Sequence, residues 1–230
     1  MPTQTLLIAC GERDTATTTA LTKRFREDGY DVLRSEATDN DGIAAAVASL
    51  TAQHGPIDAL VYLSPPPAAG TVLDRGTDVL TERVRTDLDA GTRWLQHTVR
   101  TMLDNRVHGR ITLVGHITAA VPTQRFSYCS TSQLALMNLS RGAVLELADR
   151  GIRVNTILRG WDADRPDQAE HVRELRELHA DDGVPLLGFT DPDEVAKAAL
   201  LFSDPAMTSL NGALLTLDSG FQISRKIRYS

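Results

Sequence analysis

The sequence has few cysteines, no excess of positive charge and no long apolar run. Two cysteines, Cys10 and Cys129, are too few for a disulfide framework and have no metal-binding spacing. A net charge of -6 leaves no basic face for nucleic acid or anionic lipid. The apolar runs are too short to cross a bilayer, and the N-terminus lacks the charged lead of a signal peptide. We therefore expect a cytoplasmic protein with no membrane and no nucleic-acid partner.

Strand and helix signals alternate along the whole chain, which predicts a single domain, 1–230. Such alternation is typical of an α/β fold, a Rossmann-like doubly wound parallel sheet in a three-layer α/β/α arrangement. The clearest unit spans Gly109 to Gly160, where an apolar strand, a long amphipathic helix and a second strand follow one another. In such a fold the loop before that helix lies at the carboxyl ends of the strands, where ligands bind. The predicted strands are residues 5–10, 30–34, 57–63, 111–114, 152–158 and 213–218, and the predicted helices include 17–28, 43–54 and 77–105.

A series of short motifs occurs in one order and spacing along the chain. They are Gly55-Pro56-Ile57-Asp58-Ala59-Leu60-Val61, Gly109-Arg110-Ile111, Leu145-Glu146-Leu147-Ala148, Gly151-Ile152-Arg153-Val154-Asn155, Pro192-Asp193-Glu194-Val195-Ala196, and Asn211-Gly212 followed by Leu217-Asp218-Ser219-Gly220. Taken together, this order resembles the short-chain dehydrogenase/reductase (SDR) family over nearly the whole length. The resemblance implies a nicotinamide cofactor across the strand ends and an Asn-Ser-Tyr-Lys tetrad that handles the proton.

All four tetrad positions differ from the family pattern. Counting back from the Gly151 motif without a gap, the Tyr position is Cys129 and the Lys position is Gln133. The Ser position is His116, and the Asn position in the preceding helix is Asp87. An alternative register uses Tyr128 as the phenol but needs an extra residue and still provides no lysine, whose ammonium would lower the phenol pKa. The sequence therefore predicts a divergent member without the catalytic Ser-Tyr-Lys.

The turn after the first strand predicts a weakened nucleotide site. Only Gly11 remains of the family's Gly-rich turn, while Glu12 and Asp14 bring negative charge to the place of a diphosphate. Tyr62-Leu63-Ser64-Pro65 replaces the family's Asn-Asn-Ala-Gly. The spacing between Gly29 and Asp58 is shorter than usual by roughly twenty residues, about one helix and one strand of a crossover. We therefore expect one helix-strand element to be missing near the N-terminal half, with Asp39 either capping the next helix or lying near an adenine.

The candidate catalytic residues are His116, Cys129, Asp87 and Tyr128, with Gln133 at the family's Lys position. His116 suits a general acid or base, and a neighbouring Cys129 suits either a nucleophile or a small apolar filler. Asp87 would orient His116 or keep a structural hydrogen bond. Tyr62 and Trp161 are candidate substrate-binding residues, and 161–188 corresponds to the family's substrate lid. No spacing in the chain predicts a metal site, and His171 and His179 fit a solvated helix face.

Three functions from different classes remain open at this point. The first is a cofactor-independent enzyme, which uses acid/base chemistry to cyclise, dehydrate or isomerise a small carbonyl or polyketide-like metabolite. The second is a non-catalytic pseudoenzyme that serves as an oligomer partner or ligand-binding subunit. The third is a residual NADPH-dependent ketoreductase. The expected partners are a small-molecule ligand and either another copy, as a homodimer or homotetramer, or an active SDR; the composition suggests secondary metabolite biosynthesis.

Overall fold

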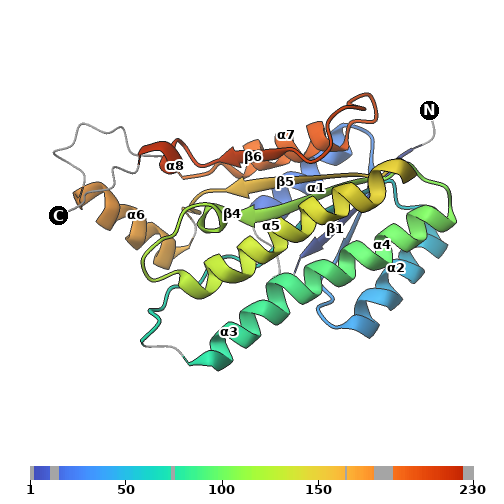
Figure 1. The fold of residues 1–230 in the computed structure, drawn as a ribbon. Coiled ribbons are helices and arrows are strands. Elements are labelled where there is room, and N and C mark those ends of the chain that lie inside the picture. The colour runs from blue at the N-terminus through green and yellow to red at the C-terminus, as the bar shows by residue number, and fades with distance from the viewer. Residues whose placement is uncertain (1–2, 11–15, 74–75, 164, 179–188, 225–230) are drawn as a thin grey trace.

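The computed structural model describes residues 3–10, 16–73, 76–163, 165–178 and 189–224. Its sheet contains six parallel strands, β1 (Thr5–Cys10), β2 (Asp31–Ser35), β3 (Ala59–Leu63), β4 (Arg110–His116), β5 (Arg153–Arg159) and β6 (Leu214–Leu217). Helices cover both faces of this sheet (Figure 1). The predicted Rossmann-like, three-layer α/β/α fold is therefore confirmed.

The strand order is β2-β1-β3-β4-β5-β6. The chain moves outward from β1 to β2, and then returns to the other side of β1 to form β3. A single helix, α2 (Asn40–His54), makes this crossover, and β2 lies at the edge of the sheet. One helix-strand element was expected to be missing between Gly29 and Asp58, and the structure accordingly has only α2 between β2 and β3. Asp39 caps α2, because its side chain accepts a hydrogen bond from the Gly42 amide at 2.8 Å.

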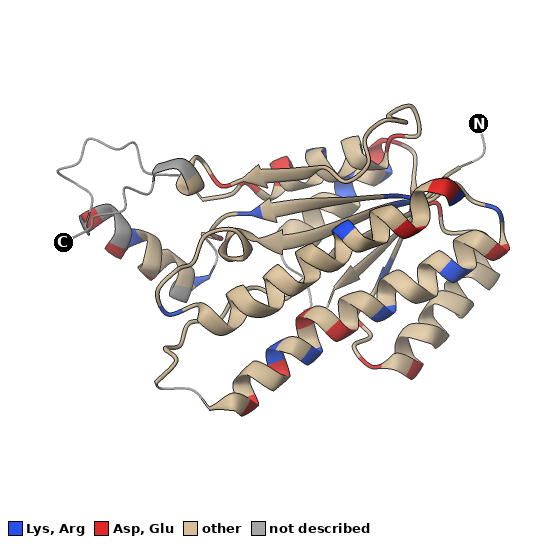
Figure 2. Ribbon diagram, viewed as in Figure 1, with Lys and Arg blue, Asp and Glu red and all other residues tan. Residues whose placement is uncertain are grey.

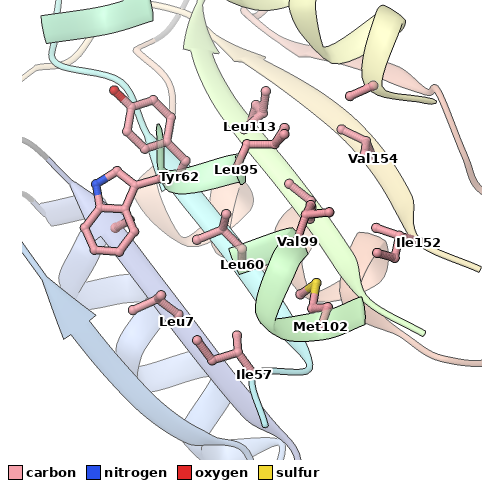
Figure 3. Close-up of a cluster of buried hydrophobic side chains, with 14 of the residues drawn as sticks. Leu7, Ile57, Leu60, Tyr62, Leu95, Val99, Met102, Leu113, Ile152 and Val154 are labelled. Carbon is pink, nitrogen blue, oxygen red and sulfur yellow. The ribbon is translucent and has the colours of Figure 1, made fainter. Parts of the chain in front are cut away.

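The hydrophobic core divides between the two faces because side chains alternate along each strand. In β1, Leu7 and Ala9 pack toward α2, α4 (Ala90–Asp104) and α5 (Ser127–Leu147). Leu6 and Ile8 point the other way, toward α1 (Ala16–Glu27) and α7 (Pro192–Ser203). Figure 3 shows the first of these clusters, in which side chains from the strands meet those of α4.

The predicted helical region 77–105 is helical throughout but changes its winding. It consists of α3 (Thr77–Arg83), a π-helical segment η1 (Val84–Asp89) and α4. The apolar positions alone cannot predict this change, since a π turn differs from an α turn by one residue of winding. The π-helical segment contains Asp87, which is 0% exposed, and such segments are frequent at functional sites.

The remaining elements complete the crossovers of the carboxyl-terminal half. A short 3-10 helix η2 (Ile117–Ala119) follows β4, and η3 (Ala148–Arg150) follows α5 before Gly151, whose φ of 72° favours glycine. Helices α6 (Pro166–Leu178) and α8 (Phe221–Ser224) follow β5 and β6. None of the described helices is long and apolar enough to span a membrane. Figure 2 shows Lys and Arg residues spread along several helices and strands.

Candidate functional site

The sequence-predicted site residues lie where β3, β4 and β5 end and α5 begins. Parallel strands bring their carboxyl ends to one edge, so Ser64, His116 and Arg159 lie at this edge. The first three turns of α5 contribute Cys129, Ser132 and Gln133, and η1 contributes Asp87.

Gln133 connects α5 to the ends of two strands. Its side-chain oxygen accepts hydrogen bonds from the Ser64 hydroxyl at 3.1 Å and from the His116 amide at 3.2 Å. A Cβ atom at Gly115 would lie 2.9 Å from this oxygen, so the glycine permits the close approach. Gln133 is 1% exposed. The Gln133 amide therefore holds the ends of β3 and β4 together.

Asp87 is a buried acid with a hydrogen bond and an ion pair. The Ser132 hydroxyl donates to its carboxylate, and the Arg83 guanidinium approaches the same oxygen at 3.0 Å. Burial raises the pKa of Asp87 from 3.8 to about 6, against the opposite effects of Arg83, Ser132 and Gln133. Its second oxygen, Oδ1, has no hydrogen-bond partner within 3.5 Å among the described residues. Asp87 therefore exchanges its proton near neutral pH.

Cys129 is held by the loop that follows β3. Its sulfur lies 3.2 Å from both the amide nitrogen and the carbonyl oxygen of Ala68, so it accepts from one and donates to the other. Burial raises the pKa of the Cys129 thiol, although Arg83 acts in the opposite direction. A thiol with a raised pKa is a poor nucleophile near neutral pH. These contacts favour the packing role over the nucleophilic role.

Tyr62 lies under the site and not on its surface. Its ring belongs to the core cluster on the α4 side (Figure 3), and its hydroxyl lies 3.1 Å from the Thr86 carbonyl and 3.2 Å from that of Asp87. Burial raises the pKa of this phenol far above its usual value. Within the described residues, Tyr62 therefore supports the π-helical segment, and its assignment to substrate binding stays a prediction.

His116 and Trp161 form part of an aromatic cluster between β4, the start of α5 and α6. The two ring centres are 4.7 Å apart, and Trp161 also packs against Phe126 and His171. His116 is 1% exposed, and its Nδ1 accepts a hydrogen bond from the Thr118 amide at 3.3 Å. Burial lowers the pKa of His116 well below 6.5. The imidazole is therefore neutral at physiological pH, and Asp87 is not among the hydrogen-bond partners found for it.

Tyr128 is half-buried in the first turn of α5. This helix is α-helical without interruption from Ser127 to Leu147. The assignment of the family's Tyr position to Cys129 rather than to Tyr128 stays a prediction. The lid segment lies partly outside the described residues, as do His179 and the turn 11–15.

The sequence interpretation missed three residues of the site. Arg83, Ser132 and Ser64 connect Asp87 and Gln133 to the surrounding chain. Arg83 had a readable signal, because it lies four residues before Asp87 on one helical run. Ser64 had none beyond its place at a strand end. No group of residues suited to a metal ion occurs in the described parts of the chain.

A family profile described as enoyl-(acyl carrier protein) reductase matches residues 4–222. The chain belongs to the short-chain dehydrogenase/reductase family. Cis-4-hydroxycyclohexanecarboxylate dehydrogenase of Sinomonas cyclohexanicum is 29% identical over 86% of this chain and 80% of its own length. D-threitol dehydrogenase of Mycolicibacterium smegmatis is 24% identical over 82% of this chain and 72% of its own length.

Solved SDR structures share the fold at low identity. ElxO with bound NADP has a TM-score of 0.80 at 16% identity, and the match covers 95% of this chain and 98% of ElxO. Sorbitol-6-phosphate 2-dehydrogenase SrlD from Erwinia amylovora has a TM-score of 0.81 at 17% identity, and the match covers 94% of this chain and 99% of SrlD.

These comparisons correct two expectations from the sequence. The relatives found by sequence are named as dehydrogenases, which contradicts the expectation of a cofactor-independent cyclase, dehydratase or isomerase and of a pseudoenzyme. The structural relative ElxO binds NADP, which contradicts the expectation that no nicotinamide cofactor takes part. The substitutions at individual positions leave intact the parallel sheet whose strand order reverses at β1, an arrangement at which α/β folds bind dinucleotides.

Proposed function

We propose that this SDR protein is an NAD(P)-linked oxidoreductase that interconverts an alcohol and a carbonyl group on a small molecule. One observation carries the proposal: the strand order reverses at β1, which lies between β2 and β3. In open α/β sheets, dinucleotides bind in the crevice outside the carboxyl ends of the strands at such a reversal. The dehydrogenase names of the sequence relatives support the same activity.

The described residues around this crevice fit a dinucleotide. β1 ends at Cys10, and the next described residue, Ala16, begins α1, so a helix N-terminus comes next along the chain after β1. The first turn of α1 has no acidic residue, and its amides and dipole favour a diphosphate. The charges of Glu12 and Asp14, in the turn outside the described residues, act against this binding. Arg34 lies exposed near the carboxyl end of β2, where a guanidinium accommodates the 2′-phosphate of NADP. We therefore infer a preference for NADPH over NADH.

The proposed chemistry differs from the family pattern in its proton handling. A bound nicotinamide supplies or accepts the hydride. In this chain the family's Tyr and Lys positions are Cys129 and Gln133, whose polar atoms bond to Ala68, Ser64 and His116. We infer that the proton is held at the carboxyl group of Asp87 instead, with the Ser132 hydroxyl as its hydrogen-bond partner. The pKa of about 6 suits this role, since a proton-exchanging group works best near the operating pH.

Steady-state assays test the proposal. NADPH oxidation would be followed at 340 nm with a panel of cyclic ketones, sugar ketones and aromatic aldehydes. We expect turnover with at least one of these substrate classes. The rate should change with pH around pH 6 in wild type, and this change should be absent in the Asp87→Asn variant. Asp89→Asn is the matched control, because Asp89 lies two residues further on the same helical run with a 43% exposed side chain. Turnover whose pH profile is unchanged in Asp87→Asn would rule out Asp87 as the proton holder.

The oligomeric state, the location, the metabolic role and the domain division also stay proposals. A homo-oligomer fits a family whose members commonly associate. The cytoplasmic location and a role in secondary metabolism rest on the sequence alone. The division into one domain with a substrate lid over 161–188 also stays a proposal.

A further inference from the structure

Two arginines begin the neighbouring strands β4 and β5. Arg110 and Arg153 are Cα partners in the parallel register, so their side chains leave the sheet on the same face. Like charges at directly paired positions of a sheet repel one another and lower stability. The pKa of Arg153 is lowered by burial and, next, by the charge of Arg110. The pair is therefore a concentration of positive charge inside the fold.

Arg110 has too few partners for a buried charge. It is 5% exposed, and its hydrogen bond to the backbone is a long one, from Nη1 to the His108 carbonyl at 3.4 Å. Its Nε and Nη2 atoms have no hydrogen-bond partner among the described residues. A guanidinium cannot deprotonate in a protein, so its charge must be compensated where it lies.

The surrounding groups do not supply that compensation. Among the described residues, no carboxylate forms an ion pair with Arg110 within 4.0 Å. Arg153 donates to the neutral carbonyls of Asp204 at 2.7 Å and Met207 at 2.6 Å. The carboxylate of Asp204 accepts from the Ala206 amide, and it attracts Arg153 without contacting it. The Tyr30 hydroxyl is a hydrogen-bond partner of Arg110, but burial raises the pKa of this phenol, so Tyr30 brings no negative charge.

A cavity of about 350 Å³ opens beside the two arginines. His108, Thr208 and Asn211 line it together with Arg110 and Arg153. Two guanidiniums, an imidazole, a hydroxyl and an amide are all groups that donate hydrogen bonds to phosphate oxygens. The space suits one tetrahedral group with a small substituent and is too small for a dinucleotide.

We propose that this cavity is a binding site for a phosphate group, carried by free phosphate or by a small phosphate ester, between Arg110 and Arg153. The site is separate from the candidate active site, because Arg110 and His116 lie at opposite ends of β4, roughly 20 Å apart by the rise of a strand. Its test is therefore independent of whether the chain binds a nicotinamide nucleotide.

Thermal unfolding in phosphate tests the site. Wild-type protein would be unfolded in inorganic phosphate and in chloride at equal pH and ionic strength. At about ten times the dissociation constant, we expect phosphate to raise the Tm by about 3 °C or more. The Arg110→Met variant should lose this rise. Arg141→Met removes the same charge from an exposed position on α5 and should keep it. An equal rise in wild type and Arg110→Met would overturn the proposal.

Calorimetric titration of the wild type keeps the proposal testable if Arg110→Met does not fold. Inorganic phosphate, glycerol phosphate and acetate would be titrated in turn. We expect saturable binding of one phosphate group per chain, and weaker binding of acetate because a carboxylate has fewer acceptor oxygens. Tighter binding of glycerol phosphate assigns the site to an ester, and tighter binding of inorganic phosphate assigns it to the free ion. The absence of saturable binding by both would refute the site.

Discussion

The Asp87→Asn substitution gives the most quantitative test of the site. Burial raises the pKa of Asp87 from 3.8 to about 6. Each pKa unit corresponds to about 1.4 kcal/mol, so the charged form of Asp87 destabilises the folded protein by about 3 kcal/mol. The folded protein binds this proton more tightly than the unfolded chain does. The stabilising effect of the proton is therefore greatest below pH 4 and is lost as pH rises through about 6.

Only part of this change falls in an accessible pH range. Between pH 5 and pH 8, a carboxyl group with these two pKa values changes the free energy of unfolding by about 1.4 kcal/mol. Asparagine keeps the shape and accepts the hydrogen bond from Ser132, but it does not titrate. From pH 5 to pH 8, we therefore expect the free energy of unfolding to fall by about 1.4 kcal/mol more in wild type than in Asp87→Asn.

Urea unfolding at pH 5 and pH 8 measures the difference. Asp89→Asn again serves as the control, because Asp89 is 43% exposed and pairs with Arg93 at the surface. Its pH dependence should match that of wild type. If Asp87→Asn and wild type changed in parallel with pH, Asp87 would not titrate with a raised pKa, and its role as the proton holder would fail with it.

Three further predictions concern residues around the site. Tyr62→Phe should lower the free energy of unfolding by about 1 kcal/mol in urea unfolding, because the hydroxyl that donates to the Thr86 or Asp87 carbonyl is removed; an unchanged midpoint would contradict this. The Cys129 thiol should react with a disulfide reagent at pH 8 far more slowly than a free thiol, as measured by absorbance, since its pKa is raised and its sulfur contacts Ala68; rapid labelling of Cys129 in the folded Cys10→Ser variant would disprove it. Arg34→Ala should weaken NADPH binding about tenfold or more and leave NADH binding nearly unchanged in fluorescence titrations; an equal loss for both would refute the assigned 2′-phosphate contact.

The fold was predictable because its signals are local and repeated. Apolar runs bounded by Gly or Pro gave the strands to within about two residues, a usual error for element boundaries. The stop at Gly151 was readable, since a left-handed residue at the end of a helix is most often glycine. The missing helix-strand element followed from counting residues between Gly29 and Asp58. The π-helical segment was not predictable, because one extra residue of winding leaves the apolar pattern of 77–105 almost unchanged.

The position of the site was predictable from the sequence, but the hydrogen-bond partners of its residues were not. Counting along the chain placed Asp87, Cys129 and Gln133 at one sheet edge, and the structure brings all three there. Their partners come from segments far away in sequence, such as Ala68 for Cys129 and Ser64 for Gln133. No periodicity encodes such pairs. Burial also decides protonation, as in His116, whose lowered pKa depends on packing that the sequence does not display.

Direct titration with NADPH tests the central claim, that this SDR scaffold still serves nicotinamide chemistry. Protein fluorescence, to which Trp94 and Trp161 contribute, would be followed as NADPH and then NADH are added. We expect saturable binding of one NADPH per chain in the micromolar range and weaker binding of NADH. Failure of both nucleotides to bind at millimolar concentration, in protein shown to be folded by circular dichroism, would contradict it.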